Sequence, residues 1–307
     1  MERLSTPSGR AAALVIAAAV LFGTTGTAQA LGAHGAPAPV VGGLRIAVGG
    51  LLLAGLALLR ERWRPIAALL GGHARAVLLG ASAVASYQLC FFSGVATTGV
   101  ALGTLVAIGS GPVCAGLLGL AIRERPTARW AAATVLAVSG GAVLLLAGRS
   151  ANVVPLGVLL AFGAGVSYAM MTVAARHLVA SGRDSTNVMT VLFLGAALLL
   201  LAAWIGRDLR PLAGPAGVAT IAWLGVFATA IPYLLFGRGL RSLPAASVTT
   251  LTLAEPLTAT LLALVVLRER PTAVGWLGAA LIAAGLLVAA AVAPSRQSSL
   301  PRDGTER

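Results

Sequence analysis

The amino-acid sequence predicts an all-α integral membrane protein with ten transmembrane helices, arranged as two inverted five-helix repeats. Three observations support this prediction. Of the 307 residues, 58% are hydrophobic and only 10% are charged, against about 25% charged in ordinary soluble domains. Charge-free runs long enough to cross a bilayer recur along the whole chain. A five-residue segment that follows one such run is found again after a later run.

Backbone N–H and C=O groups in a bilayer need internal partners, so we interpret the apolar runs as helices. The predicted helices are about 11–33, 39–59, 76–95, 100–122, 130–148, 154–175, 187–205, 217–237, 245–267 and 273–293. The third and fourth divide the charge-free stretch between Arg75 and Arg123, which is too long for one helix. We place the division at Ala96–Gly99, where a Thr-Thr-Gly sequence favours a turn.

The first predicted helix has an alternative interpretation. Arg3 and Arg10 precede an apolar stretch that ends in Ala28-Gln29-Ala30, an order that is also typical of a secretory signal peptide. Cleavage there would make Leu31 the first residue and leave nine helices. The sequence leaves both interpretations open, and mass spectrometry of the mature N-terminus distinguishes them.

The net charge of +13 comes from 22 Arg and no Lys, against 9 acidic residues. The arginines lie between apolar runs, so they indicate membrane orientation and contact with anionic lipids rather than nucleic-acid binding. With the N-terminus in the cytoplasm, 16 of the 22 arginines fall on the cytoplasmic side. We therefore predict a multi-pass protein of the bacterial inner membrane with both termini cytoplasmic. Cys90 and Cys114 lie inside apolar runs and predict no disulfide, metal site or cofactor.

The segment Arg123-Glu124-Arg125-Pro126-Thr127 recurs 145 residues later as Arg268-Glu269-Arg270-Pro271-Thr272. At nearly the same shift, further residues align: Phe22 with Tyr168, Tyr87 with Tyr233, Gly94 with Gly239, and Gly111-Pro112 with Glu255-Pro256. The chain therefore divides near Ser150 into repeats at 11–149 and 153–293, followed by a polar, disordered tail at 294–307. Five helices per repeat place the second repeat upside down relative to the first, as in many secondary transporters.

These segments resemble a known family. Pro112 and Pro256 in mid-helix, the Glu-Arg-Pro-Thr exits, Leu44-Arg45-Ile46 and Leu253-Ala254-Glu255-Pro256 are similar to the two EamA repeats of the drug/metabolite transporter superfamily. The resemblance covers about residues 11–293. It implies ten helices, cytoplasmic termini, and transport of amino acids, metabolites or toxic small molecules, most often as export.

Glu255 is the leading candidate for a functional residue. It lies near the middle of its predicted helix, where a carboxylate costs about 2.5–3.5 kcal/mol by insertion scales. With Thr249, Thr252 and Thr258 it forms a polar stripe at three-residue steps. We expect this stripe to line a central cavity in which Glu255 binds a substrate ammonium group or carries a proton. The alternative is a structural carboxylate that is hydrogen-bonded to the other repeat.

Arg45 is a second charge inside an apolar run, six residues after Pro39. It either extends to the outer surface along its own aliphatic stem or binds a substrate carboxylate. The predicted cavity residues are Tyr87, Gln88, Tyr168 and Tyr233. Weaker candidates are Thr24, Thr25, Gln29 and Ser167, since Ser and Thr in spans often only contact neighbouring helices. Pro112 and Pro256 are predicted gating or hinge positions.

The sequence thus predicts a secondary transporter or facilitator that moves small polar or amphipathic metabolites by alternating access. Its partners are a small-molecule substrate and membrane lipids, with protons as the candidate coupling ion and a monomer or homodimer as the assembly. An intramembrane enzyme and a lipid-binding membrane scaffold are the alternatives. The enzyme is disfavoured because His34, His73 and His177 lie at helix ends or in loops, and because Glu255 is the only acid deep in a predicted span.

Overall fold

The computed structural model describes residues 7–33, 35–59, 69, 71–147, 154–204, 207–266, 268 and 272–291. The predicted tail at 294–307 and the repeat boundary near Ser150 lie outside the described residues. Some of the arginines that predict the membrane orientation also lie outside the described residues. These are Arg3, Arg60, Arg62, Arg64, Arg149, Arg270, Arg296, Arg302 and Arg307.

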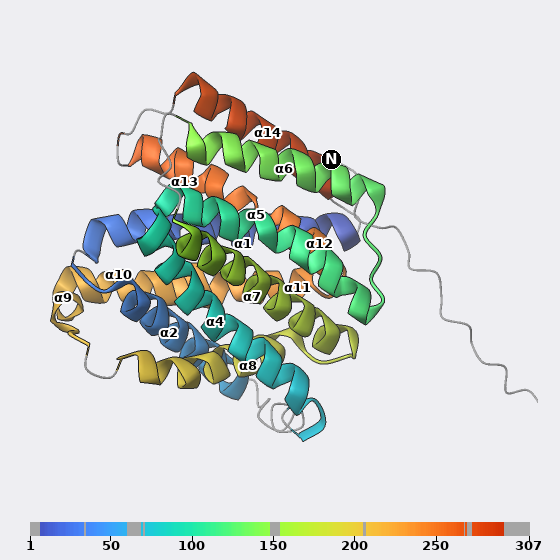
Figure 1. Ribbon diagram of the computed structural model, residues 1–307. Coiled ribbons are helices and arrows are strands. Elements are labelled where there is room, and N and C mark those ends of the chain that lie inside the picture. Colours follow the sequence, from blue (N-terminus) through green and yellow to red (C-terminus); the bar gives the residue numbers. More distant parts are fainter. Residues whose placement is uncertain are drawn as a thin grey trace, which may run out of the picture.

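The described elements are helices (Figure 1). In the first half these are α1 (Pro7–Gly32), α2 (Ala38–Leu59), α4 (Ala74–Thr98), α5 (Val100–Gly119) and α6 (Ala128–Leu146). In the second half they are α7 (Pro155–Ala180), α8 (Ser185–Leu200), α9 (Arg210–Ala213), α10 (Pro215–Gly225), α11 (Ile231–Gly239), α12 (Ala245–Leu251), α13 (Ala254–Val265) and α14 (Ala273–Ala291). A π-helical turn, Val226–Ala230, joins α10 to α11.

Among the described residues, 8 helices are long and apolar enough to cross a membrane. The shorter apolar helix α8 and the divided segment α12–α13 correspond to the other two predicted crossings. Large apolar side chains such as Leu51, Leu78, Leu117 and Leu287 face outward, an arrangement that suits a lipid environment rather than water. The prediction of an all-helical membrane protein is therefore confirmed, while the number of ten crossings stays a prediction.

Of two predictions about where helices begin and end, one is confirmed and one is wrong. The division at Ala96–Gly99 is confirmed, because α4 ends at Thr98 and Gly99 adopts a φ of 90° before α5 begins. The prediction of one continuous helix at 245–267 is wrong. α12 ends at Leu251, and a turn at Thr252 and Leu253 separates it from α13.

Pro256 contributes to this break. Proline has no backbone N–H, and its ring collides with the carbonyl of the residue four positions earlier, which here is Thr252. The chain closes the turn with tighter bonds, from the Glu255 N–H to the Thr252 carbonyl at 2.9 Å and from the Leu253 N–H to the Thr250 carbonyl at 3.1 Å. Pro112, its counterpart in the repeat, lies inside α5 without interrupting that helix.

The helix contacts repeat when the two halves of the chain are exchanged. α1 packs against α11 and α13, and its counterpart α7 packs against α4 and α5. Likewise α2 contacts α10 while α8 contacts α4, and the counterparts α2 and α8 contact each other. α6 and α14 lie side by side at one edge of the bundle (Figure 1). This pattern is that of a two-fold pseudosymmetric bundle, which agrees with the predicted repeat.

Candidate substrate pocket

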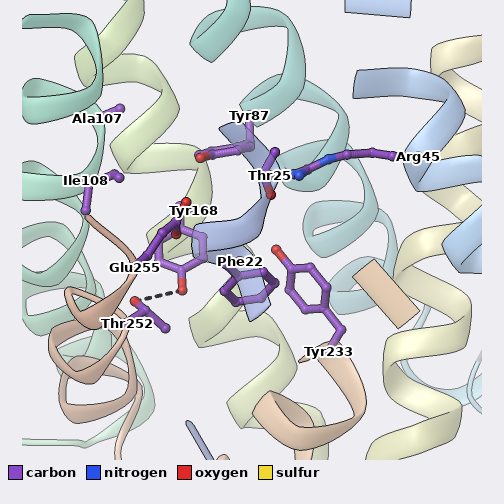
Figure 2. A pocket seen from close by; sticks show the side chains of 10 residues that line it. All are labelled: Phe22, Thr25, Arg45, Tyr87, Ala107, Ile108, Tyr168, Tyr233, Thr252 and Glu255. Carbon is purple, nitrogen blue, oxygen red and sulfur yellow. Dashed lines mark hydrogen bonds between the residues drawn. The ribbon is translucent and has the colours of Figure 1, made fainter. Parts of the chain in front are cut away.

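A pocket lies where the two halves meet, and both halves contribute to its lining. Its residues come from α1, α2, α4 and α5 in the first half and from α7, α11, the α12–α13 turn and α13 in the second. They are Phe22, Thr25, Arg45, Tyr87, Ala107, Ile108, Tyr168, Tyr233, Thr252 and Glu255 (Figure 2).

Arg45 and Glu255 give the pocket one charge of each sign. The Arg45 side chain is extended from α2 toward the part of the pocket that holds Thr25 and Tyr87 (Figure 2). Arg45 is 8% exposed, and its Nε has no hydrogen-bond partner within the described part of the chain. The side chain therefore turns into the pocket, and the interpretation in which it extends to the outer surface is wrong.

The Glu255 carboxylate lines the same pocket as Arg45. Over the described residues, however, no ion pair within 4.0 Å joins the two, and no hydrogen bond reaches the carboxylate. The interpretation of Glu255 as a structural carboxylate that is hydrogen-bonded to the other repeat thus finds no support in this region. Two opposite charges face one small space without neutralising each other directly.

Tyrosine side chains supply the other polar groups. The Tyr168 hydroxyl donates to the Thr252 Oγ1 at 3.1 Å, and the Thr252 hydroxyl donates to the Thr249 carbonyl at 2.8 Å. The Tyr233 ring is held between Phe22 and Phe193, with centroid separations of 4.9 and 4.2 Å. These contacts fix the aromatic walls, so the pocket is largely shaped before any ligand enters.

The pocket also follows the repeat. Phe22 aligns with Tyr168 and Tyr87 aligns with Tyr233, and all four line the pocket. The pseudo-two-fold relation of the halves therefore converges on this space. The charges break the symmetry, because Gly111 stands opposite Glu255 in the alignment. A Cβ at Gly111 would lie 3.2 Å from the Tyr168 ring, so the glycine makes room for that ring.

Comparison with known proteins agrees with the repeat and the helical bundle. The sequence model of the EamA-like transporter family matches residues 9–146 and matches again at residues 155–291. The chain belongs to the EamA-like transporter family. As a member of this family it is a multi-pass membrane transporter, and its substrate is a small molecule.

Two similar proteins extend this comparison. The EamA-like chain is 37% identical over 292 residues to the uncharacterized transporter YwfM of Bacillus subtilis (strain 168), covering 93% of this chain and 95% of that protein. A solved crystal structure superposes with a TM-score of 0.80 at 22% identity, covering 92% of this chain and 97% of the other. The latter likeness shows the fold alone.

Three predicted site residues of the EamA-like chain lie outside the pocket. Gln88 is buried on α4, and its Oε1 points toward α2. A Cβ added to Gly42 of α2 would lie 3.0 Å from this oxygen. The Ser167 hydroxyl donates to the Gly163 carbonyl at 2.7 Å. The Thr24 hydroxyl donates to the Leu21 carbonyl at 2.7 Å and accepts from the Trp223 indole at 3.1 Å.

Each of these three is the chain neighbour of a residue that does line the pocket. Successive side chains on an α-helix point about 100° apart, because 3.6 residues make one turn. Tyr87, Tyr168 and Thr25 therefore face the pocket while Gln88, Ser167 and Thr24 face adjacent helices. The polar stripe is likewise shorter than predicted, since Thr249 and Thr258 bond backbone carbonyls and do not line the pocket.

Phe22, Ala107 and Ile108 line the pocket but were not among the predicted site residues. A signal for two of them existed in the repeat. Phe22 aligns with Tyr168, and Ile108 lies 144 residues before Thr252, the shift that also pairs Pro112 with Pro256. Carrying each predicted residue across the repeat would have found both.

Proposed function

We propose that this EamA-like transporter moves small zwitterionic solutes of the amino-acid class across the bacterial inner membrane by alternating access, in the direction of export. The observation that carries this proposal is that Arg45 and Glu255 line one pocket with no ion pair between them in the described part of the chain. Charges within a membrane span are costly unless they are paired, hydrated or matched by a ligand. A solute with an ammonium and a carboxylate group offers each of them its opposite charge.

The remaining pocket residues fit the rest of such a solute. Phe22, Ile108 and Ala107 offer apolar contact to a side chain, and the tyrosine rings also offer faces for cation–π contact with an ammonium group. Thr25 and Thr252 offer hydroxyls for hydrogen bonds. Glu255 is also the pocket group that is able to take up a proton, which makes protons the proposed coupling ion.

The first experiment tests the two charges separately. Purified protein in liposomes is given a labelled neutral amino acid, the corresponding amine without a carboxylate, and the corresponding N-acetyl acid without an ammonium group. We expect flux of the zwitterion and losses of about 10-fold or more for either analogue, because a charge-assisted hydrogen bond contributes about 1.5–3 kcal/mol. Equal flux of all three compounds would contradict zwitterion recognition.

Variants assign each charge to its partner. Glu255→Gln should lose discrimination for the ammonium group, and Arg45→Gln should lose discrimination for the carboxylate. Ser167→Ala is the matched control, because this residue lies beside Tyr168 but outside the pocket. An unaltered pH response of flux in Glu255→Gln would overturn the proposed proton coupling while leaving substrate binding in place.

A further inference from the structure

An ion pair away from the pocket joins the two halves of the chain at one end of the bundle. The Glu124 Oε1 accepts from the Arg176 Nε at 2.6 Å, and both side chains are 11% exposed. Glu124 belongs to the segment between α5 and α6 of the first half, and Arg176 belongs to α7 of the second. The pocket function described above uses neither residue.

The same two side chains also hold the connection between α11 and α12. The Glu124 Oε2 accepts from the Ala245 N–H at 2.8 Å, at the start of α12, where Pro244 provides no side-chain cap. The Arg176 Nη1 donates to the Leu240 carbonyl at 2.7 Å, at the end of α11. Negative charge at a helix start and positive charge at a helix end are both stabilising.

Local structure places Glu124 for this task. α5 ends in a 3₁₀ turn, Arg123 adopts a left-handed φ of 63°, and the Glu124 N–H returns to the Gly119 carbonyl at 2.9 Å. This helix end aims the Glu124 side chain at α12 instead of at the solvent. The repeated Arg-Glu-Arg-Pro-Thr segment marks the repeat in the sequence, and in its first copy it also contributes this inter-repeat contact.

A second tie lies next to the ion pair. The Trp130 indole on α6 donates to the Ala246 carbonyl and to the Thr250 hydroxyl, both at 3.0 Å. Thr134, one turn further along α6, shares a hydrogen bond of 2.8 Å with the same Thr250. Hydrogen bonds from the first half thus hold α12 near both of its ends, and α12 leads directly to Thr252 and Glu255 in the pocket.

The repeat does not reproduce this arrangement at the opposite end. The position equivalent to Arg176 is Ala30 or Leu31 at shifts of 146 or 145 residues, and neither side chain is charged. Trp130 is equivalent to Gly275 at the shift of 145. The cation that ties one end therefore has no sequence counterpart at the other, whereas an indole, that of Trp276, stands one residue away from the position equivalent to Trp130.

We propose that Glu124 and Arg176 form a clamp that keeps the pocket closed on their side of the membrane, and that the clamp must open for the pocket to face that side. The distribution of arginine predicts that the side of the membrane on which the clamp lies is the cytoplasmic side. The inference rests on the alternating access proposed above. α12 spans about 10 Å between Ala245 and the pocket, so release of its first residue frees the wall that separates the pocket from that side.

Cysteine accessibility tests the clamp without requiring a known substrate. Thr25→Cys, in a background of Cys90→Ala and Cys114→Ala, reports access to the pocket through its rate of reaction with a membrane-impermeant maleimide. Vesicles of both orientations are compared. Glu124→Gln should raise labelling from the Glu124 side by about 10-fold and lower it from the opposite side, because loss of a charge-assisted pair shifts a two-state equilibrium by that order.

Controls separate a gate from a merely structural contact. Arg125→Gln on the same loop removes an exposed charge and should change neither rate. Arg176→Gln should change the labelling rates in the same direction as Glu124→Gln. The double variant should change these rates no more than either single variant does. Glu124→Asp keeps the charge on a shorter side chain and should give intermediate labelling rates. This variant replaces Glu124→Gln in the test if Glu124→Gln does not fold.

Three results would overturn the clamp: labelling that is unchanged, labelling that rises equally from both sides, or a double variant whose effect is the sum of the singles. Equal rises with a lower melting temperature would assign the pair to stability alone. A shifted labelling pattern in a protein that moves no zwitterion in liposomes would instead support the clamp and refute the proposed substrate class.

Discussion

Tyr168 is the residue at which packing and polar chemistry meet in the pocket. Its ring fits against Gly111 of α5, and its hydroxyl is held by Thr252 in the α12–α13 turn. It therefore connects α7 to α5, which carries Pro112, and to the turn that precedes Pro256; both prolines are predicted hinge positions. We expect a residue in this position to couple a movement of the turn to the wall of the pocket.

Tyr168→Phe should lower substrate affinity by a few fold while leaving the fold intact. The change keeps the ring and removes one hydrogen bond, whose net contribution is about 0.5–1.5 kcal/mol. Ligand-dependent thermal shift and liposome flux measure the effect. Ser167→Ala removes the neighbouring hydroxyl outside the pocket, and a loss of affinity in that variant equal to the loss in Tyr168→Phe would contradict the assignment.

At the scale of elements, α6 and α14 show how small residues bring helices together. A Cβ added to Gly140 would lie 2.6 Å from the Ile282 backbone nitrogen, and one added to Gly285 would lie 2.7 Å from the Ala137 nitrogen. Gly140 and Gly285 are themselves related by the shift of 145 residues. Close approach of backbones is the usual basis of helix association in membranes, where apolar burial between helices gains little over lipid.

Gly140→Ala should therefore destabilise the protein, whereas Gly141→Ala should not. The added methyl group at 140 forces the two backbones apart, and overpacking of this kind typically costs about 1–3 kcal/mol. A methyl group at Gly141 meets no atom within 4 Å. Melting temperatures in detergent compare the two variants, and equal values would show that the α6–α14 contact does not limit stability.

At the scale of the whole molecule, the two halves share one pattern of helix contacts and one pocket. The pattern follows from the repeat, but the membrane orientation rests on the distribution of arginine. Arg125 and Arg183 are predicted on the cytoplasmic side, and Arg207 and Arg210 on the outer side. If both repeats have five crossings, three helices separate Arg125 from Arg207, and these two residues must lie on opposite sides of the membrane.

Single cysteines at Arg125 and Arg207 test this orientation. In a background without Cys90 and Cys114, an impermeant maleimide should label Arg125→Cys only from the cytoplasmic side and Arg207→Cys only from the outer side. Both residues are exposed, so access is not limited by packing. Labelling of both from the same side would refute the predicted number of crossings between them.

Several features of this protein could be predicted from the sequence because they depend on local composition or on the repeat. Charge-free runs identified the helices, Thr-Thr-Gly identified the break at Gly99, and the repeat identified the family. Tyr87, Tyr168, Tyr233, Arg45, Thr252 and Glu255 were predicted at the site and do line one pocket. Their roles in binding stay a proposal.

Other features depend on directions and contacts that a sequence of apolar residues does not encode. Which of two adjacent polar residues faces the pocket follows from the rotation of each helix, and this rotation is decided by its neighbours. The break before Pro256, with no break at Pro112, depends on what surrounds each proline. The Glu124–Arg176 pair joins residues 52 positions apart.

The sequence by itself determined that this chain is a helical membrane protein built from two related halves. The apolar runs are long enough to cross a bilayer only as helices, and the repeated residues identify the two halves directly. Only the tertiary structure decided that Arg45 turns inward, that it shares a pocket with Glu255, and that one end of the bundle is tied by an ion pair. The physical reason is that long-range packing sets the direction of each side chain, whereas composition sets only the environment in which the helices lie.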